Sequence, residues 1–116
     1  MKYLVEMKLA DSGRSTNPQD GAVFIERYIL PSLAACKELE AAGKILAGGA
    51  VAGAIALALI VEAESIQELD ELLAGLPIWP RMETSVVPLT TFDGRMAAVR
   101  PRLERLKSIL QSKTQV

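Results

Sequence analysis

The chain has 116 residues, half of them apolar, so it is long enough for one domain with a single hydrophobic core. Its formal net charge of −1 argues against nucleic acid as a partner, because phosphate binding requires a net basic surface. The sequence contains no histidine, which excludes the commonest general base and the commonest metal ligand of proteins. A single cysteine, Cys36, excludes a disulfide framework and a thiolate metal cluster. No metal site is therefore expected.

The N-terminal residues predict a half-buried strand over residues 2–9, because charged and apolar side chains alternate there with a period of two. This segment lacks the continuous apolar block of a signal peptide, so a cytoplasmic protein is expected. Residues 10–21 predict a long polar loop, which serves either as a lid or as a disordered segment. The apolar side of the strand carries Tyr3, Val5, Met7 and Leu9, and the charged side carries Lys2, Glu6 and Lys8.

A helix is predicted over residues 20–42, where apolar residues recur at spacings of three and four. Pro31 lies inside this helix and should kink or split it, since proline lacks a backbone N–H and clashes with the preceding turn. Gly43 is the expected C-cap residue. Cys36 belongs to the apolar stripe and is expected to be a small buried residue rather than a nucleophile.

The apolar run over residues 45–61 has two interpretations. It could be a short membrane helix, because its glycines and alanines have the small-residue spacing of packed membrane helices. However, the run has no basic cluster at its ends, and its later part alternates large residues with alanines. We therefore expect two buried strands joined near residues 52–53, and no membrane partner.

The next helix is predicted to begin after Glu64 or Ser65 and to end near Ala74. Its apolar residues have helical spacing, and its acidic outer face is expected to be solvated. The stripe consists of Ile66, Leu69, Leu72 and Leu73, and the acidic residues are Glu68, Asp70 and Glu71.

A proline-rich turn and a strand follow this helix. Pro77 and Pro80 fix their own φ angles and restrict the residues before them, so residues 76–80 predict a stiff extended turn. This turn holds Trp79, the only tryptophan of the chain. The β-branched run over residues 84–91 predicts the fourth strand.

A terminal helix is predicted to begin at Asp93 and to expose a coiled-coil-like apolar seam. Its many basic residues indicate a solvated face more than a nucleic-acid or membrane surface. The seam consists of Met96, Val99, Leu103, Leu106 and Leu110, and the basic residues are Arg95, Arg100, Arg102, Arg105, Lys107 and Lys113.

The predicted order, strand-helix-strand-strand-helix-strand plus a helix, is that of an α+β ferredoxin-like fold: a four-stranded antiparallel sheet with helices on one face. We expect one domain over residues 1–116, with the βαββαβ core in residues 1–92 and the C-terminal helix and tail in residues 93–116. The face without helices is too apolar for solvent, which predicts a homodimer with the sheets packed face to face or edge to edge.

Residues 37–89 resemble the muconolactone isomerase family. The resemblance lies in KELEAAG at the end of the first helix, in two consecutive strands, and in SIQELDELLAGLPIWPRMETSVVPL. Its most specific part is a Leu-Pro-x-aromatic-Pro-x-Met element, which consists of Leu76, Pro77, Trp79, Pro80 and Met82.

The resemblance implies a dimeric α+β barrel that assembles into a homo-oligomer. It also implies a double-bond shift in a lactone of aromatic-compound catabolism, without metal or organic cofactor. The second and third strands, KILAGGAVAG and AIALALIVEA, are nearly bare of polar groups, so none of the family's catalytic residues on these strands can be carried over to this chain.

Without histidine, the base of such an isomerase would be a carboxylate whose pKa is raised in an apolar pocket. Glu6 and Glu83 are the predicted catalytic residues, because both lie on strands that could line a cavity between sheet and helices. Glu6 could instead form a solvent-exposed ion-pair row with its neighbouring lysines. Glu83 could instead pair with Arg81, two residues earlier on the same strand.

The predicted substrate-binding residues have structural alternatives too. The two tyrosines could donate a hydrogen bond to an enolate or be buried aromatic residues, and the two cations could hold a substrate carboxylate. Trp79 could anchor the turn or form a pocket wall. The set consists of Tyr3, Tyr28, Lys44, Trp79 and Arg81.

Three functions remain open for a chain of this kind. The first is a cofactor-free isomerase of a small lactone or related carboxylate. The second is a non-catalytic binder of a small apolar ligand, which requires a roomy hydrophobic cavity. The third is a purely structural homo-oligomer with solidly packed strands.

Overall fold

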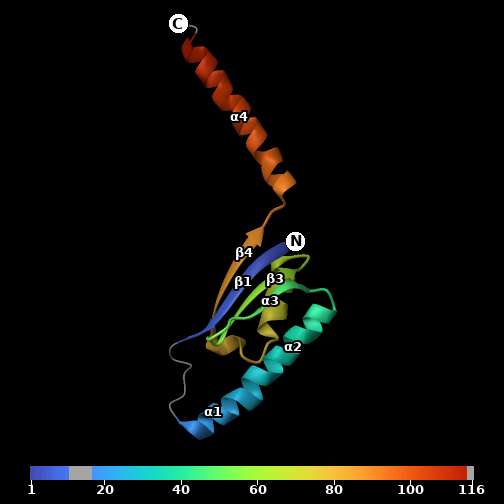
Figure 1. The fold of residues 1–116 in the computed structure, drawn as a ribbon. Helices are drawn as coiled ribbons and strands as arrows, with labels where there is room; N and C mark the ends of the chain where they lie inside the picture. Colours follow the sequence, from blue (N-terminus) through green and yellow to red (C-terminus); the bar gives the residue numbers. More distant parts are fainter. Residues whose placement is uncertain (11–16, 115–116) are drawn as a thin grey trace.

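The computed structural model describes residues 1–10 and 17–114. The four strands form one antiparallel sheet in the order β2-β3-β1-β4, with the helices of the core on one face (Figure 1). This is the predicted ferredoxin-like βαββαβ fold followed by a C-terminal helix. In chain order the elements are β1 (Lys2–Leu9), α1 (Pro18–Phe24), the π-helix η2 (Ile25–Ile29), α2 (Leu30–Ala41), β2 (Ile45–Ala50), β3 (Ala56–Glu62), α3 (Ile66–Ala74), the 3₁₀-helix η3 (Trp79–Arg81), β4 (Met82–Leu89) and α4 (Phe92–Thr114).

The hydrophobic core lies between the sheet and the helices. The central strand β1 buries Tyr3, Val5 and Met7 and exposes the residues between them, as its period of two predicts. Alternate residues of β3 and the inner side of α3 contribute most of the other core residues, and this burial of apolar area is the main stabilising contribution. These further core residues are Leu57, Leu59 and Val61 from β3 and Leu69 and Leu73 from α3.

The helical segment from α1 to α2 is continuous despite Pro31. The five-residue π-helix η2 precedes the proline, and the Leu30 N–H donates to the Ile25 carbonyl. This wider turn lets the chain remain helical at a residue that has no N–H to donate. The helix begins at Pro18 instead of the predicted residue 20, because the Asn17 side chain accepts hydrogen bonds from the first-turn amides of Gln19 and Asp20.

The C-terminal end of α2 and the N-terminal end of α3 are capped as the sequence predicts. Gly43 follows α2 with a φ of 78°, and the Lys44 N–H donates to the Leu39 carbonyl at 2.9 Å. Ser65 caps α3 by accepting from the Glu68 N–H at 3.1 Å. Both interactions satisfy backbone groups that a helix end leaves unpaired.

The apolar run over residues 45–61 forms the hairpin of β2 and β3, as expected. No helix within residues 1–10 and 17–114 has the length and hydrophobicity that crossing a membrane requires. The pairing of β2 shifts register between Ile45 and Ala47, and Gly48 follows with a φ of 106°. A side chain at Gly48 would collide with the Ala58 carbonyl oxygen, so β2 approaches β3 too closely for any larger residue.

The prediction of an extended turn over residues 76–80 is wrong. Leu76 and Ile78 are buried, and the Trp79 N–H donates to the Leu76 carbonyl at 2.9 Å. The Ile78 N–H donates to the buried Ser32 hydroxyl of α2 at 3.0 Å. Burial of these two side chains favours a compact turn over the extended form that the prolines alone would allow.

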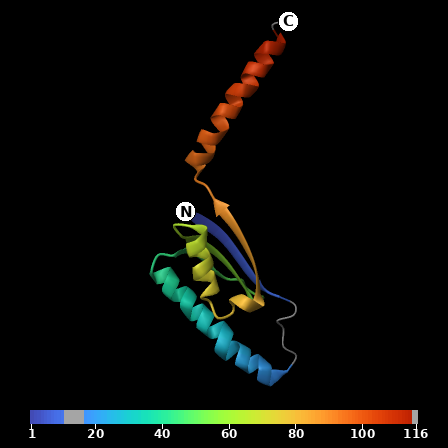
Figure 2. The same ribbon diagram turned by 180° about the vertical axis from the view of Figure 1, so that it is seen from behind.

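Helix α4 projects away from the rest of the molecule (Figures 1 and 2). The molecule including α4 measures 78 × 31 × 24 Å. The prediction that Asp93 caps this helix is wrong. The cap is Thr91, whose hydroxyl accepts from the Gly94 N–H at 2.9 Å. The helix packs extensively against no other described element.

Replacement of Gly48 by alanine is expected to lower the free energy of unfolding by about 1–3 kcal/mol, because it strains the backbone and drives β2 from β3. The adjacent Gly49→Ala variant is the matched control. Its added methyl group meets open space, so a change within about 0.5 kcal/mol is expected. Denaturant unfolding of both variants measures the difference, and equal stability would contradict the close approach at Gly48.

Candidate functional site

Both predicted catalytic carboxylates lie on the open face, which we define as the sheet face without helices. Glu6 of β1 aligns with Ser85 of β4, and Lys8 aligns with Glu83, so Glu6 and Glu83 are diagonal neighbours. Cross-strand diagonal neighbours are within reach of long side chains. Glu6, Lys8 and Glu83 line a hollow of about 490 Å³. The other residues around this hollow include Val51, Ala56, Ala58, Thr84 and Ser85.

The predicted position of these carboxylates between sheet and helices is wrong. Glu6 lies between Val5 and Met7 in the chain, and both of these face the helices, so Glu6 must face the other way. Both carboxylates are exposed. Their roles stay predictions, but any site that uses them is on the open face.

The charges around this hollow are partly paired. The Lys8 Nζ lies 3.5 Å from the Glu83 Oε2, and both side chains are more than half exposed. Among the described residues, no ion pair involves Glu6. The sequence also suggested a pair between Glu83 and Arg81. The structure pairs Glu83 with Lys8 instead, because Arg81 belongs to η3 and not to the strand.

Tyr28 and Arg81 come together on the helix side of the sheet. The Arg81 guanidinium lies 4.6 Å from the Tyr28 ring centroid and 5.5 Å from that of Phe24, and the two rings are 5.8 Å apart. Such contacts are favourable cation–π interactions and fix the guanidinium in position. Sequence reasoning missed Phe24, although its spacing of four residues from Tyr28 places both rings on one side of a helix.

Two apolar hollows lie beside this cluster, between α2 and the β2–β3 hairpin. Their volumes are about 120 and 280 Å³, and both are lined by Leu33, Ala50 and Leu57. Ile29 and Met82, which follow Tyr28 and Arg81 in the chain, also line the smaller hollow. Because the two hollows share three lining residues, they form one apolar groove on the helix side, and its wall includes the residues next in sequence to Tyr28 and Arg81.

Polar groups are scarce in these hollows. Among the described residues that line the smaller hollow, Ser32 has the one polar side chain, and it already accepts from the Ile78 N–H. Cys36, Lys37 and Glu40 line the larger one. Burial raises the pKa of the Cys36 thiol above its usual value of 9.0, so the thiol is neutral and a poor nucleophile at neutral pH.

The structure does not bring the other predicted substrate-binding residues into these sites. Tyr3 is buried in the core, and its hydroxyl donates to the Met1 Sδ at 3.5 Å. Trp79 is 36% exposed and lines none of the three hollows. No group of three potential metal ligands occurs within the described part of the chain.

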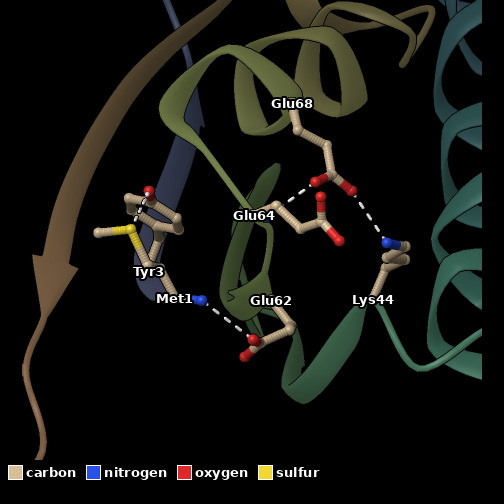
Figure 3. Close-up of polar contacts among 6 residues, drawn as sticks. All are labelled: Met1, Tyr3, Lys44, Glu62, Glu64 and Glu68. Carbon is tan, nitrogen blue, oxygen red and sulfur yellow. Dashed lines mark hydrogen bonds and ion pairs between the residues drawn. The ribbon is translucent and has the colours of Figure 1, made fainter.

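Lys44 lies at the opposite end of the sheet from Arg81: its carbonyl accepts from the Glu62 N–H, opposite the start of β1, whereas the Arg81 carbonyl accepts from the Ala10 N–H just after the end of β1. The Lys44 side chain points towards Glu68 of α3 (Figure 3). Its Nζ donates to the Glu68 Oε1 at 2.9 Å, and the Glu68 Oε2 accepts from the Glu64 N–H at 2.7 Å. The hydrogen bond from Lys44 lowers the pKa of Glu68 below its usual 4.5, and the same bond raises the pKa of Lys44 above 10.5. Lys44 therefore ties the start of β2 to α3, and its predicted contact with a substrate carboxylate stays a prediction.

Comparison with known proteins identifies the family of this chain. The family model described as muconolactone delta-isomerase matches residues 1–94. A search of curated proteins found no match.

Several solved structures share the fold, and two of them illustrate the likeness. A muconolactone isomerase is 21% identical with a TM-score of 0.64, and the likeness covers 78% of this chain and 90% of that chain. A 5-chloro-2-hydroxyhydroquinone dehydrochlorinase from Burkholderia phenoliruptrix AC1100, in complex with 2,5-dihydroxybenzoquinone, is 24% identical with a TM-score of 0.56. That likeness covers 81% of this chain and 98% of the dehydrochlorinase chain.

The Lys44–Glu68 pair predicts a pH-dependent contribution to stability. Because the pKa of Glu68 is lowered on folding, its contribution is present above pH 4.5 and is lost as the pH falls through the folded value. Because the pKa of Lys44 is raised on folding, its contribution to stability is fully present below pH 10.5. This contribution is lost as the pH rises through the pKa that Lys44 has in the folded protein.

Glu68→Gln is therefore expected to lower the thermal midpoint at neutral pH and to have little effect in strong acid. The difference should also shrink at high salt, because both side chains are partly exposed to solvent. Glu71→Gln, on the same helix, is the control. A Glu68→Gln effect that is constant from neutral pH to strong acid would contradict the ion pair.

Proposed function

Because the chain belongs to the muconolactone delta-isomerase family, we propose that it is a cofactor-free isomerase acting on a small lactone or related carboxylate of aromatic-compound catabolism. The observation that carries the proposal is the gathering of Glu6, Lys8 and Glu83 around one hollow of the open face. The hollow supplies a carboxylate base and a cation side by side. A proton shift on an anionic lactone requires these two groups.

Each group has a distinct role in this proposal. Glu6, which has no ion pair among the described residues, takes a proton from the saturated ring carbon next to the double bond that is conjugated with the lactone carbonyl. The protonated Glu6 returns a proton to another ring carbon, so the double bond moves and the composition of the substrate is unchanged. Lys8 holds the substrate carboxylate, and Glu83 positions Lys8 and is the second candidate for the return step.

The base needs a drier environment than the exposed sheet gives it. A second copy packed on the open face would remove water from Glu6 and raise its pKa towards the working range. The open face has apolar positions that suit such a contact, and this is the homodimer expected from the sequence. These positions are Leu4, Ala58, Ile60, Val87 and Leu89.

The isomerase proposal predicts that Glu6→Gln lowers kcat for muconolactone by about 10²–10⁴-fold, the usual contribution of a general base. Glu83→Gln is expected to raise KM as well, because it disturbs Lys8. The control is Glu71→Gln, an exposed carboxylate on α3. Full turnover by the Glu6→Gln variant would overturn the assignment of the base.

A second function is favoured by the apolar helix-side hollows. In this alternative the chain binds a small, mostly apolar carboxylate without turning it over. The ring would lie against Leu33, Ala50 and Leu57, and the carboxylate would contact Arg81 beside the groove. The lack of free polar groups in the smaller hollow supports binding more than chemistry there.

Benzoate binding distinguishes the two functions. If the helix-side groove is the ligand site, Ala54→Leu and Arg81→Met should each weaken benzoate binding at least about tenfold, or about 1.4 kcal/mol. Glu6→Gln should leave that binding unchanged. The reverse pattern, with binding lost only in Glu6→Gln, would place the ligand on the open face.

A further inference from the structure

Helix α4 differs sharply in charge from the remainder of the chain. Residues 92–116 contain six lysines and arginines and two acidic residues, a formal charge of +4. Residues 1–91, which we call the acidic body, contain seven basic and twelve acidic residues, a formal charge of −5. The near-neutral total therefore conceals two oppositely charged parts.

Helix α4 also presents an apolar stripe to solvent. Its members recur at alternating spacings of three and four residues, the heptad pattern of a helix that packs lengthwise on a partner. Their exposed fractions are 50% for Met96, 42% for Val99, 48% for Leu103, 52% for Leu106 and 63% for Leu110.

An isolated helix of this kind needs a partner surface. Pro101 lies inside α4 and removes one hydrogen bond of the helix, at a cost of about 3 kcal/mol. Helices in proteins gain most of their stability from packing of an apolar side. Residue 94 ends the family match, so the stripe lies beyond the part of the chain that the family model covers.

Two copies of α4 are a poor match for each other. If the stripe occupies heptad positions a and d, the flanking e and g positions hold Arg95, Arg100, Arg102, Lys107 and Ile109. In a parallel pair, Arg95 would face Arg100 of the other helix, and Arg102 would face Lys107. Like charges at these positions oppose pairing, and an antiparallel pair would also place basic residues together.

We propose that the apolar stripe of α4 packs on the acidic body of a second copy of this chain, and not on a second α4. The charges of the two surfaces are complementary, and the body offers exposed apolar side chains beside carboxylates. Examples are Leu30 on α2, four residues along the helical segment from Glu26, and Ile66 on α3, four residues from Asp70. The proposal does not depend on the reaction that the protein catalyses.

Self-association of the full chain, measured by sedimentation equilibrium, tests this proposal. The double variant Leu103→Glu, Leu106→Glu should weaken assembly at least about tenfold. The double variant Leu103→Met, Leu106→Met keeps the apolar volume and should assemble as the wild type does. Circular dichroism of each variant verifies that the chain remains folded.

Charge and salt separate the proposed contact from a coiled coil. Raising the salt from about 0.05 to 0.5 M screens charges and should weaken docking on the acidic body, whereas it would tighten a repulsive α4 pair. Arg100→Glu with Arg102→Glu should weaken docking on the body too. In a parallel α4 pair, the same variant would place a glutamate opposite Arg95 and another opposite Lys107, so the pair would become stronger.

Three results would overturn the proposal. They are assembly that the Leu103→Glu, Leu106→Glu variant leaves unchanged, assembly that salt tightens, and a wild-type chain that is monomeric at all concentrations. A monomer with a small radius would show that α4 folds back on its own body.

Discussion

The alternation of side chains along β1 is the constraint on which the rest of the structure depends. This strand lies between β3 and β4, so its register determines which residues of both neighbours face the helices. Val5 and Met7 enter the core, and Glu6 between them is forced to the open face. The same register brings Glu83 diagonal to Glu6. The separation of an apolar groove from a charged hollow therefore follows from one two-residue period.

The helix side depends on a second set of interactions. The π-helix η2 carries the chain past Pro31, and Ser32 then accepts from the Ile78 N–H in the core. This bond fixes the turn that leads into η3, and η3 places Arg81 over Tyr28. A helical irregularity and one buried hydroxyl thus position the only aromatic–arginine cluster among the described residues.

The sequence predicted the order of elements, the sheet and the core of this fold, because periods of two and of three to four residues are local properties. It did not predict the compact turn at Ile78, whose burial depends on contacts with α2. The sequence also placed Glu6 on the correct strand but on the wrong face of the sheet. A two-residue period assigns side chains to two opposite faces, but it does not say which face holds a cavity. Phe24 was missed because its partner Arg81 is distant in the chain and lies near it only after folding.

The glycine at position 48 has a consequence for how copies of this protein can associate. Strand β2 is one edge of the sheet, and the register shift before Gly48 makes its free backbone groups irregular. The other edge, β4, contains Pro88, which has no N–H to offer a neighbouring strand. Irregular or proline-containing edges resist strand addition from another chain. Growth of the sheet into an open-ended fibre is thus discouraged at both edges, and closed assembly through faces and helices is left as the favourable route.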